Sequence, residues 1–153
     1  MLIRKADAKR DQATPEQAEI LGDFSALLYS DSGGLSQFGA FTETLQPGAR
    51  SSDRHWHENE DEFLYMLEGQ ATLIEDDGPR EMRPGDVAVW AKGVANGHHI
   101  VNRSDAPCSY LIIGTRAAWD RVHYSDIDKL YTRHPDGTVT RTRRDGSPLE
   151  GRP

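Results

Sequence analysis

The sequence of 153 residues contains a single cysteine, Cys108. One cysteine cannot form a disulfide within the chain, so the fold must be held by buried apolar side chains alone or by these together with a metal ion. A chain without disulfides is typical of a reducing compartment, and we expect a cytoplasmic protein.

Long apolar runs and an excess of positive charge are also missing. No segment approaches the ~20 consecutive apolar residues that would span a bilayer, and the first residues lack the apolar core of a signal peptide. The formal net charge is −7, which would repel a phosphate backbone. The most basic stretch, residues 141–144, lies in a C-terminal segment of balanced charge. We therefore expect neither a membrane nor a nucleic acid as a partner.

Turn-forming residues, in contrast, are plentiful. The chain has 14 glycines and 8 prolines, and 36% of its residues are hydrophobic, which is typical of a polar globular protein of about one domain. Short apolar runs alternate with turn sequences such as Pro47-Gly48 and Pro84-Gly85. This spacing predicts an all-β sandwich or barrel. The expected strands cover residues 24–29, 38–45, 63–67, 71–74, 87–90, 98–101 and 110–113.

The two ends of the chain differ from this central part. Thr14, Pro15 and Gln17 form a capping-box pattern that predicts a short helix over about 15–20. A turn at 135–137 could close a peripheral hairpin. We expect an N-terminal segment over 1–22, a β-barrel over 23–116 and a C-terminal peripheral segment over 117–153.

The most informative stretch is His55-Trp56-His57, followed by Glu62. On an extended strand, residues two apart project to the same side, so the two imidazoles can chelate one ion. The four intervening residues can form a turn that brings the Glu62 carboxylate beside them. Such a set suits Fe, Mn, Ni or Zn. A third imidazole could come from His98 or from His99.

Two glycine-containing motifs make the sequence resemble the cupin family. The first family motif, G-x5-H-x-H-x3,4-E-x6-G, is matched by Gly48, His55, His57, Glu62 and Gly69, with one extra residue before His55. The second, G-x5-P-x-G-x2-H-x3-N, is matched by Gly85, Gly93, His98 and Asn102, with Ala91 in the place of proline and two extra residues before His98. The resemblance covers roughly residues 23–116, and its spacing selects His98 over His99.

The resemblance implies a double-stranded β-helix, the jelly-roll barrel of cupins, with short peripheral helices. It also implies one divalent metal ion (Fe, Mn, Zn or Ni), held by His55, His57, Glu62 and His98. Four ligands leave one or two coordination positions open for a substrate. We expect an enzyme of the dioxygenase, isomerase or lyase type that acts on a small oxygenated or carboxylate-bearing molecule, with its catalytic residues unassigned. The alternative is a non-catalytic cupin that binds, senses or stores a small ligand.

We expect the residues around the two motifs to have structural roles and not to bind the metal ion. Trp56 has the opposite strand parity from the two histidines and is expected to face outward. The acidic residues at 58, 60 and 61 are expected to form a solvated turn, and Arg50 and Arg54 are expected to pair with them. Residues 63–67 and 111–113 are apolar at every position, so both faces of these strands should be covered. We expect a second copy of the chain to supply one cover, as a homodimer.

Overall fold

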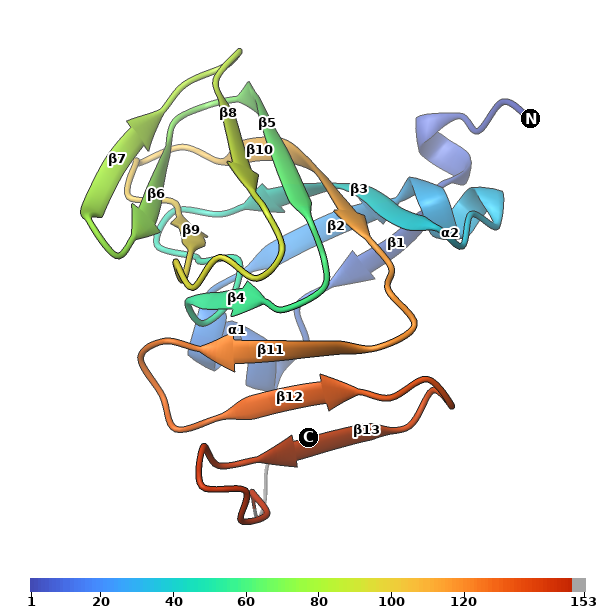
Figure 1. Ribbon diagram of the computed structural model, residues 1–153. Coiled ribbons are helices and arrows are strands. Elements are labelled where there is room, and N and C mark those ends of the chain that lie inside the picture. Colours follow the sequence, from blue (N-terminus) through green and yellow to red (C-terminus); the bar gives the residue numbers. More distant parts are fainter. Residues whose placement is uncertain (150–153) are drawn as a thin grey trace.

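The computed structural model describes residues 1–149 and is built almost entirely from β-strands (Figure 1). Residues 150–153, part of the expected C-terminal segment, lie outside the described residues. The fold is all-β, a jelly roll in which two layers of antiparallel strands enclose the core. Within the described residues, no helix has both the length and the apolar character needed to cross a membrane.

The first layer is a six-stranded sheet in the order β1-β2-β3-β10-β5-β8. All its neighbouring strands are antiparallel. Its central strand β10 runs between β3 and β5, which places Ile112 opposite both Phe41 and Leu64. The strands are β1 (Lys9–Gln12), β2 (Phe24–Leu28), β3 (Phe38–Leu45), β5 (Glu62–Glu68), β8 (Val87–Trp90) and β10 (Cys108–Thr115).

The second layer consists of two smaller sheets that meet at one bridge. Their orders are β7-β6-β9 and β13-β12-β11-β4. His55 and His98 exchange both backbone hydrogen bonds, at 3.1 and 2.9 Å, so β4 lies next to the start of β9. The strands are β4 (His55–His57), β6 (Ala71–Glu75), β7 (Gly78–Met82), β9 (His99–Val101), β11 (Asp120–Tyr124), β12 (Leu130–Arg133) and β13 (Val139–Thr142).

Short helices lie at the N-terminal side of the barrel. A 3-10 turn (Lys5–Asp7) precedes β1, and the expected helix is present as α1 (Pro15–Leu21). The predicted capping box is confirmed, because the Thr14 hydroxyl accepts from the Gln17 N–H while the Gln17 side chain accepts from the Thr14 N–H. A second helix, α2 (Tyr29–Gly33), begins at the last residue of the strand expected over 24–29, so this strand ends one residue earlier.

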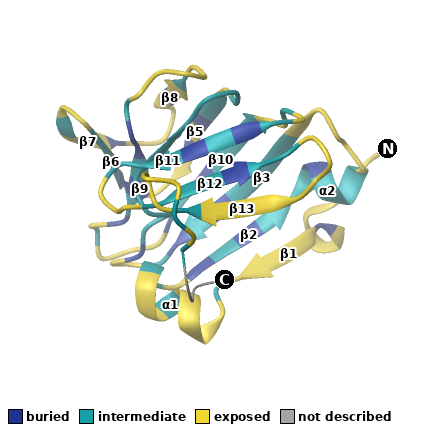
Figure 2. Ribbon diagram, turned by 60° about the horizontal axis from the view of Figure 1, so that its bottom comes forward, coloured by how far each residue is buried: buried dark blue, intermediate teal, exposed yellow. Residues whose placement is uncertain are grey.

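The core lies between the inner faces of the two layers, and Figure 2 shows the buried residues on the central strands, with β1 and β13 largely exposed. Strand parity decides this: on β5, Leu64 and Met66 point inward and have no exposed surface, whereas Tyr65 between them is 39% exposed. Gly69 permits a tight turn into β6, because its φ is +74° and an added Cβ would lie 2.6 Å from the Pro107 carbonyl oxygen.

Candidate metal centre

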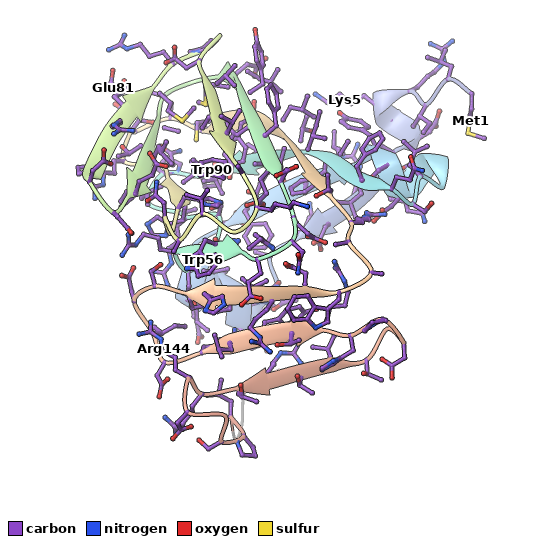
Figure 3. All side chains as sticks on the ribbon, in the orientation of Figure 1. Met1, Lys5, Trp56, Glu81, Trp90 and Arg144 are labelled. Carbon is purple, nitrogen blue, oxygen red and sulfur yellow. The ribbon has the colours of Figure 1, made fainter. Side chains whose placement is uncertain are left out.

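Strand β4 supplies two of the four predicted ligands. His55 and His57 point to the same side, and their ring centroids are 5.1 Å apart. Trp56 points to the other side, where its ring stacks on His123 with centroids 4.1 Å apart (Figure 3). The period of two along an extended strand therefore separates the two imidazoles from the indole, as expected.

Glu62 joins them from the opposite layer. It opens β5 on the same face as Leu64, so its carboxylate points into the barrel. The Glu62 Oε2 atom lies 2.8 Å from His98 Nε2 and 3.7 Å from His57 Nε2. The turn over 58–61 thus brings one carboxylate oxygen between imidazoles of the facing layer.

His98 is fixed by its neighbours in the second layer. Its backbone pairs with His55, and its ring stacks on Trp90 with centroids 3.8 Å apart and planes 9° apart. The Trp90 indole N–H donates to Glu75 at 2.9 Å, which holds the stacked pair in place. His99, by contrast, directs its Nδ1 atom to the Ser52 carbonyl oxygen, 2.9 Å away. His98 is therefore the member of this pair that meets Glu62.

The four predicted ligand residues come together between the layers. One donor atom each from His55, Glu62 and His98 lies within 4.8 Å of the others, a spacing compatible with one metal ion. His57 stands beside this group with its Nε2 atom toward Glu62. The side chains of His57 and Glu62 are 14% and 18% exposed, so the cluster is shielded from solvent but can be reached.

Burial and neighbouring charges set the protonation of this cluster. Burial lowers the pKa of His55 to about 4, although Glu62 acts in the opposite direction. Burial also disfavours charge on His57, but the carboxylates of Asp120 and Glu62 outweigh it and raise the pKa of His57 above its ordinary value. Burial would raise the pKa of Glu62, but the hydrogen bond from His98 and the nearby imidazoles lower it. A carboxylate among imidazoles is a donor set that binds divalent ions.

The orientation of the rings also fits a metal. The Nδ1 atom of His55 lies 2.9 Å from the Asp53 carbonyl oxygen, and that of His57 lies 2.7 Å from Asp120 Oδ2. A carbonyl and a carboxylate can only accept, so Nδ1 donates in both rings, and in the neutral form of each ring Nε2 keeps a lone pair. The donor set of three imidazoles and one carboxylate has a charge of −1, which suits a divalent ion.

Two groups at the site were not anticipated from sequence. Asp120 contacts His57 and lies on β11. The sequence does not predict this strand, because β11 contains no run of apolar residues. Glu60 was expected in a solvated turn, but its side chain is only 11% exposed, because its carboxylate accepts from the Ala117 N–H at 2.9 Å and pairs with Arg133. No sequence signal marks Asp120, because only the pairing of β11 with β4 brings it to His57.

The expected pairing of Arg50 and Arg54 with the acids of the turn is wrong. Arg50 pairs with Asp53 at 2.9 Å, and Arg54 pairs with Asp76 and with Asp126. These arginines lie before β4 and face the neighbouring strand connections, whereas the turn over 58–61 follows β4 at its other end. Both guanidinium groups therefore stabilise loops, and neither belongs to the cluster.

The chain is similar to known cupins over nearly its whole length. A family model for the cupin domain matches residues 41–114. The crystal structure of a sugar phosphate isomerase of the cupin superfamily from Silicibacter pomeroyi is 39% identical, with 99% of this chain and 98% of that chain covered and a TM-score of 0.89. No curated protein sequence matches this chain.

More distant structures share the fold. One is a protein provisionally named a sugar phosphate isomerase from Acidithiobacillus ferrooxidans, 22% identical, with 92% of this chain and 96% of that chain covered and a TM-score of 0.76. Another is a polyketide cyclase from Streptomyces resistomycificus, 20% identical, with 75% and 78% covered and a TM-score of 0.62. At these identities the likeness extends to the jelly roll alone, which supports unrelated reactions.

Proposed function

The chain belongs to the cupin superfamily, and on that basis we propose that it is a metal-dependent enzyme that isomerises a phosphorylated sugar. The observation that carries the proposal is the convergence of donor atoms from His55, Glu62 and His98 between the two layers, with His57 beside them. The similarity to the Silicibacter pomeroyi protein supports the choice of reaction, since it extends over 99% of this chain at 39% identity. The fold and the cluster together support the general class, an enzyme for a small oxygenated molecule.

In this proposal His55, His57, Glu62 and His98 hold one divalent ion. When bound, the ion supplies a Lewis acid for the carbonyl and the neighbouring hydroxyl oxygen of the open-chain sugar. Isomerisation moves a proton from the hydroxyl-bearing carbon to the carbonyl carbon, and the hydroxyl proton moves in the same direction, to the former carbonyl oxygen, so no oxidant or reductant is consumed. The ring of Trp90 stacks on that of His98 and covers one face of this ligand.

A surface cavity that is lined by Trp90 and by several acidic side chains would repel the phosphate group of the substrate. This surface cavity of about 600 Å³ is lined by Glu75, Asp77, Glu81 and Asp86, with Arg80 as its one lining cation. Arg80 is already paired with Glu75 and Asp77. We therefore propose that the substrate reaches the ligands from the barrel side and not through this cavity.

Removal of the metal is expected to abolish isomerisation. The protein would be dialysed against a chelator and assayed with a panel of aldose phosphates for conversion to ketose phosphates. We expect at least a ~100-fold loss of rate, because Lewis-acid stabilisation contributes several kcal/mol to such a reaction. Activity should return on addition of one equivalent of Fe²⁺, Mn²⁺, Zn²⁺ or Ni²⁺.

Two outcomes would contradict this proposal. The first is full activity in the chelated protein, which would exclude a metal role. The second is a metal-loaded protein that binds a sugar phosphate, as measured by calorimetry, without converting it. That result would favour the non-catalytic binding function.

We also propose that the chain forms a homodimer through the outer face of the six-stranded sheet. Tyr65 pairs with Val87 and Phe63 with Val89 across β5 and β8, all on the face that points away from the core. Val87 and Val89 are 49% and 66% exposed, and Leu67 on the same face is 38% exposed. A contiguous apolar face of this kind is typical of a protein interface, and a second copy of the chain offers a matching surface.

Replacing Val89 with aspartate is expected to convert the dimer to a monomer, because each interface would bury two new carboxylates next to apolar side chains. Light scattering during size-exclusion chromatography would measure the mass. Val139→Asp is the matched control, since Val139 is an exposed strand valine on β13, in the other layer. A wild-type protein that is monomeric at high concentration, or a control that dissociates equally, would refute the proposed interface.

A cytoplasmic location remains part of the proposal. Cys108, the only cysteine, is 1% exposed and has no partner with which to form a disulfide. Burial raises the pKa of its thiol to about 11, so the thiol is unreactive at neutral pH. These features are in keeping with a reducing compartment.

A further inference from the structure

Strand β11 brings a carboxylate to a predicted metal ligand from outside the part of the chain that matches the cupin model. β11 pairs with β4, with Val122 opposite His57 and Tyr124 opposite His55. Asp120, the first residue of β11, lies beyond residues 41–114 and is 2% exposed. Its Oδ2 atom lies 2.7 Å from His57 Nδ1. An acidic side chain is rarely this buried unless it is paired, so the pairing of Asp120 with His57 requires an explanation.

We propose that Asp120 is a positioning residue that keeps the proton of His57 on Nδ1, so that Nε2 faces Glu62 with a free lone pair for a metal ion. This inference rests on the proposed metal centre. A carboxylate can only accept a hydrogen bond, so the contact with Asp120 requires His57 to donate from Nδ1. The other ring nitrogen, Nε2, then lies 3.7 Å from Glu62 Oε2, on the side of the cluster.

Asp120 is itself held by the backbone. Its second oxygen, Oδ1, accepts a hydrogen bond from the Asn59 N–H at 2.9 Å. Asn59 follows His57 by two residues, so the carboxylate bridges the ligand strand and the turn that leads to Glu62. The two oxygens of Asp120 thus have different partners, and neither is free to rotate away without the loss of a buried hydrogen bond.

The neighbouring acid, Glu60, does not turn this arrangement into a second metal site. His57, Glu60 and Asp120 do place donor atoms within 4.8 Å of one another. The Glu60 carboxylate, however, pairs with Arg133 and accepts from the Ala117 N–H, while Asp120 is occupied by His57 and Asn59. A guanidinium beside the group disfavours a cation there. Glu60 and Asp120 both lie on the Nδ1 side of the His57 ring, and their other contacts keep them there.

The three imidazoles are supported in different ways. His55 directs Nδ1 to the neutral Asp53 carbonyl, at 2.9 Å, and the Nδ1 atom of His98 is buried without a partner in the described structure. Only His57 has a buried carboxylate behind it. A carboxylate behind a ligating imidazole orients the ring and increases its basicity, and its loss typically lowers metal affinity about 10- to 100-fold.

Asp120→Asn tests the assignment, because an amide has one accepting oxygen where the carboxylate has two. The backbone N–H of Asn59 always donates, so the amide oxygen should stay with it, and the NH2 group should turn toward His57. His57 would then accept at Nδ1 and carry its proton on Nε2, the nitrogen that faces Glu62. We expect the dissociation constant for Co²⁺, followed by its visible absorption, to rise about 10- to 100-fold.

The imidazole ¹⁵N shifts of the metal-free protein provide a readout that does not depend on metal binding. At a pH where His57 is neutral, we expect the Nδ1–H tautomer in the wild type and the Nε2–H tautomer in Asp120→Asn. Glu58→Gln is the matched control. The Glu58 carboxylate contacts His123 at 2.6 Å on the other face of the same strand pair, and this change should alter neither the tautomer nor Co²⁺ binding.

Three outcomes would overturn the inference. They are an Nε2–H tautomer of His57 in the wild type, wild-type Co²⁺ affinity in Asp120→Asn, and an equal loss of affinity in Glu58→Gln. If Asp120→Asn does not fold, the tautomer of the wild type decides alone. If the wild type binds no Co²⁺, the proposed metal centre fails, while the tautomer still reports separately on Asp120.

Discussion

Replacing His57 with alanine is expected to reduce bound metal from about one ion per chain to less than about a tenth, because it removes one of the three imidazoles of the ligand set. The barrel should remain folded, since His57 lies at the edge of the core and its ring packs between polar groups. The Asp120 carboxylate would lose its imidazole partner but keep the Asn59 N–H, at a cost of about 1–3 kcal/mol in the free energy of unfolding. Elemental analysis of protein purified without added metal measures the loss.

His123→Ala is the control for this experiment. His123 lies opposite Trp56 on the same pair of strands and faces away from the cluster, so its removal should leave the metal content unchanged. Circular dichroism and thermal denaturation would establish that both variants are folded. Full metal occupancy in His57→Ala would show that His57 is not a ligand.

A second large effect is expected in the pH dependence of stability, from a carboxyl group inside the barrel. Burial raises the pKa of Glu43 from 4.5 to about 7, although the hydrogen bond from the Tyr110 hydroxyl acts in the opposite direction. The pKa of Glu43 is also raised by the charge of Asp11. Tyr110 is fully buried, and Cys108 on the same strand is buried beside it. The folded barrel therefore favours the protonated form of Glu43.

The direction of the pH effect on stability follows from the pKa of Glu43 in the unfolded and the folded chain. The unfolded chain releases the Glu43 proton near pH 4.5, whereas the folded chain keeps it until about pH 7. The free energy of unfolding should therefore fall by about 3 kcal/mol between these values and stay at the lower level above pH 7. Glu62 and Asp120 have lowered pKa values and contribute in the opposite sense at lower pH, so the contribution of Glu43 must be isolated by difference.

The substitution Glu43→Gln isolates the contribution of Glu43 to the pH dependence of stability. The amide keeps the shape of the side chain and can accept from Tyr110, but it has no proton to release. We expect the variant to match the wild type near pH 5 and to be more stable by about 2–3 kcal/mol at pH 8, as measured by urea denaturation. Glu68→Gln, an exposed substitution on β5, should follow the wild type at both values. An unchanged pH profile in Glu43→Gln would contradict the buried neutral carboxyl.

The strands that pack on the core could be predicted because burial leaves a pattern in the sequence. β3 and β8 have the predicted bounds, and β5 and β10 extend the predicted strands by one or two residues at each end. β1 and β7 carry no such pattern. All four residues of β1 and the three central residues of β7 are exposed, so backbone pairing with a neighbour, and not side-chain burial, makes them strands. Sequence periodicity does not report pairing of this kind.

In the candidate site too, some residues could be predicted from local sequence and others depend on strand pairing. Spacing along β4 and the following turn is local, so the placement of His55, His57 and Glu62 could be anticipated, and the cupin motif added His98. Asp120 reaches His57 only through the pairing of β11 with β4, across 63 positions of the chain. Its flanking residues, Trp119 and Arg121, do not mark it as buried. A polar side chain buried by a distant strand has no local signature, so Asp120 could be found only in the folded structure.

The pairing of β4 with β11 also affects biosynthesis. β4 is three residues long, and its neighbours in the second layer are β11 and the bridge to His98. While the chain emerges from the ribosome, His57 is made 63 positions before Asp120, which opens the strand that pairs with β4. Contacts of such long sequence separation form late in folding. In the proposed metal centre, cation capture would therefore follow closure of the barrel, and a nascent chain stalled before residue 120 would present its histidines unsupported.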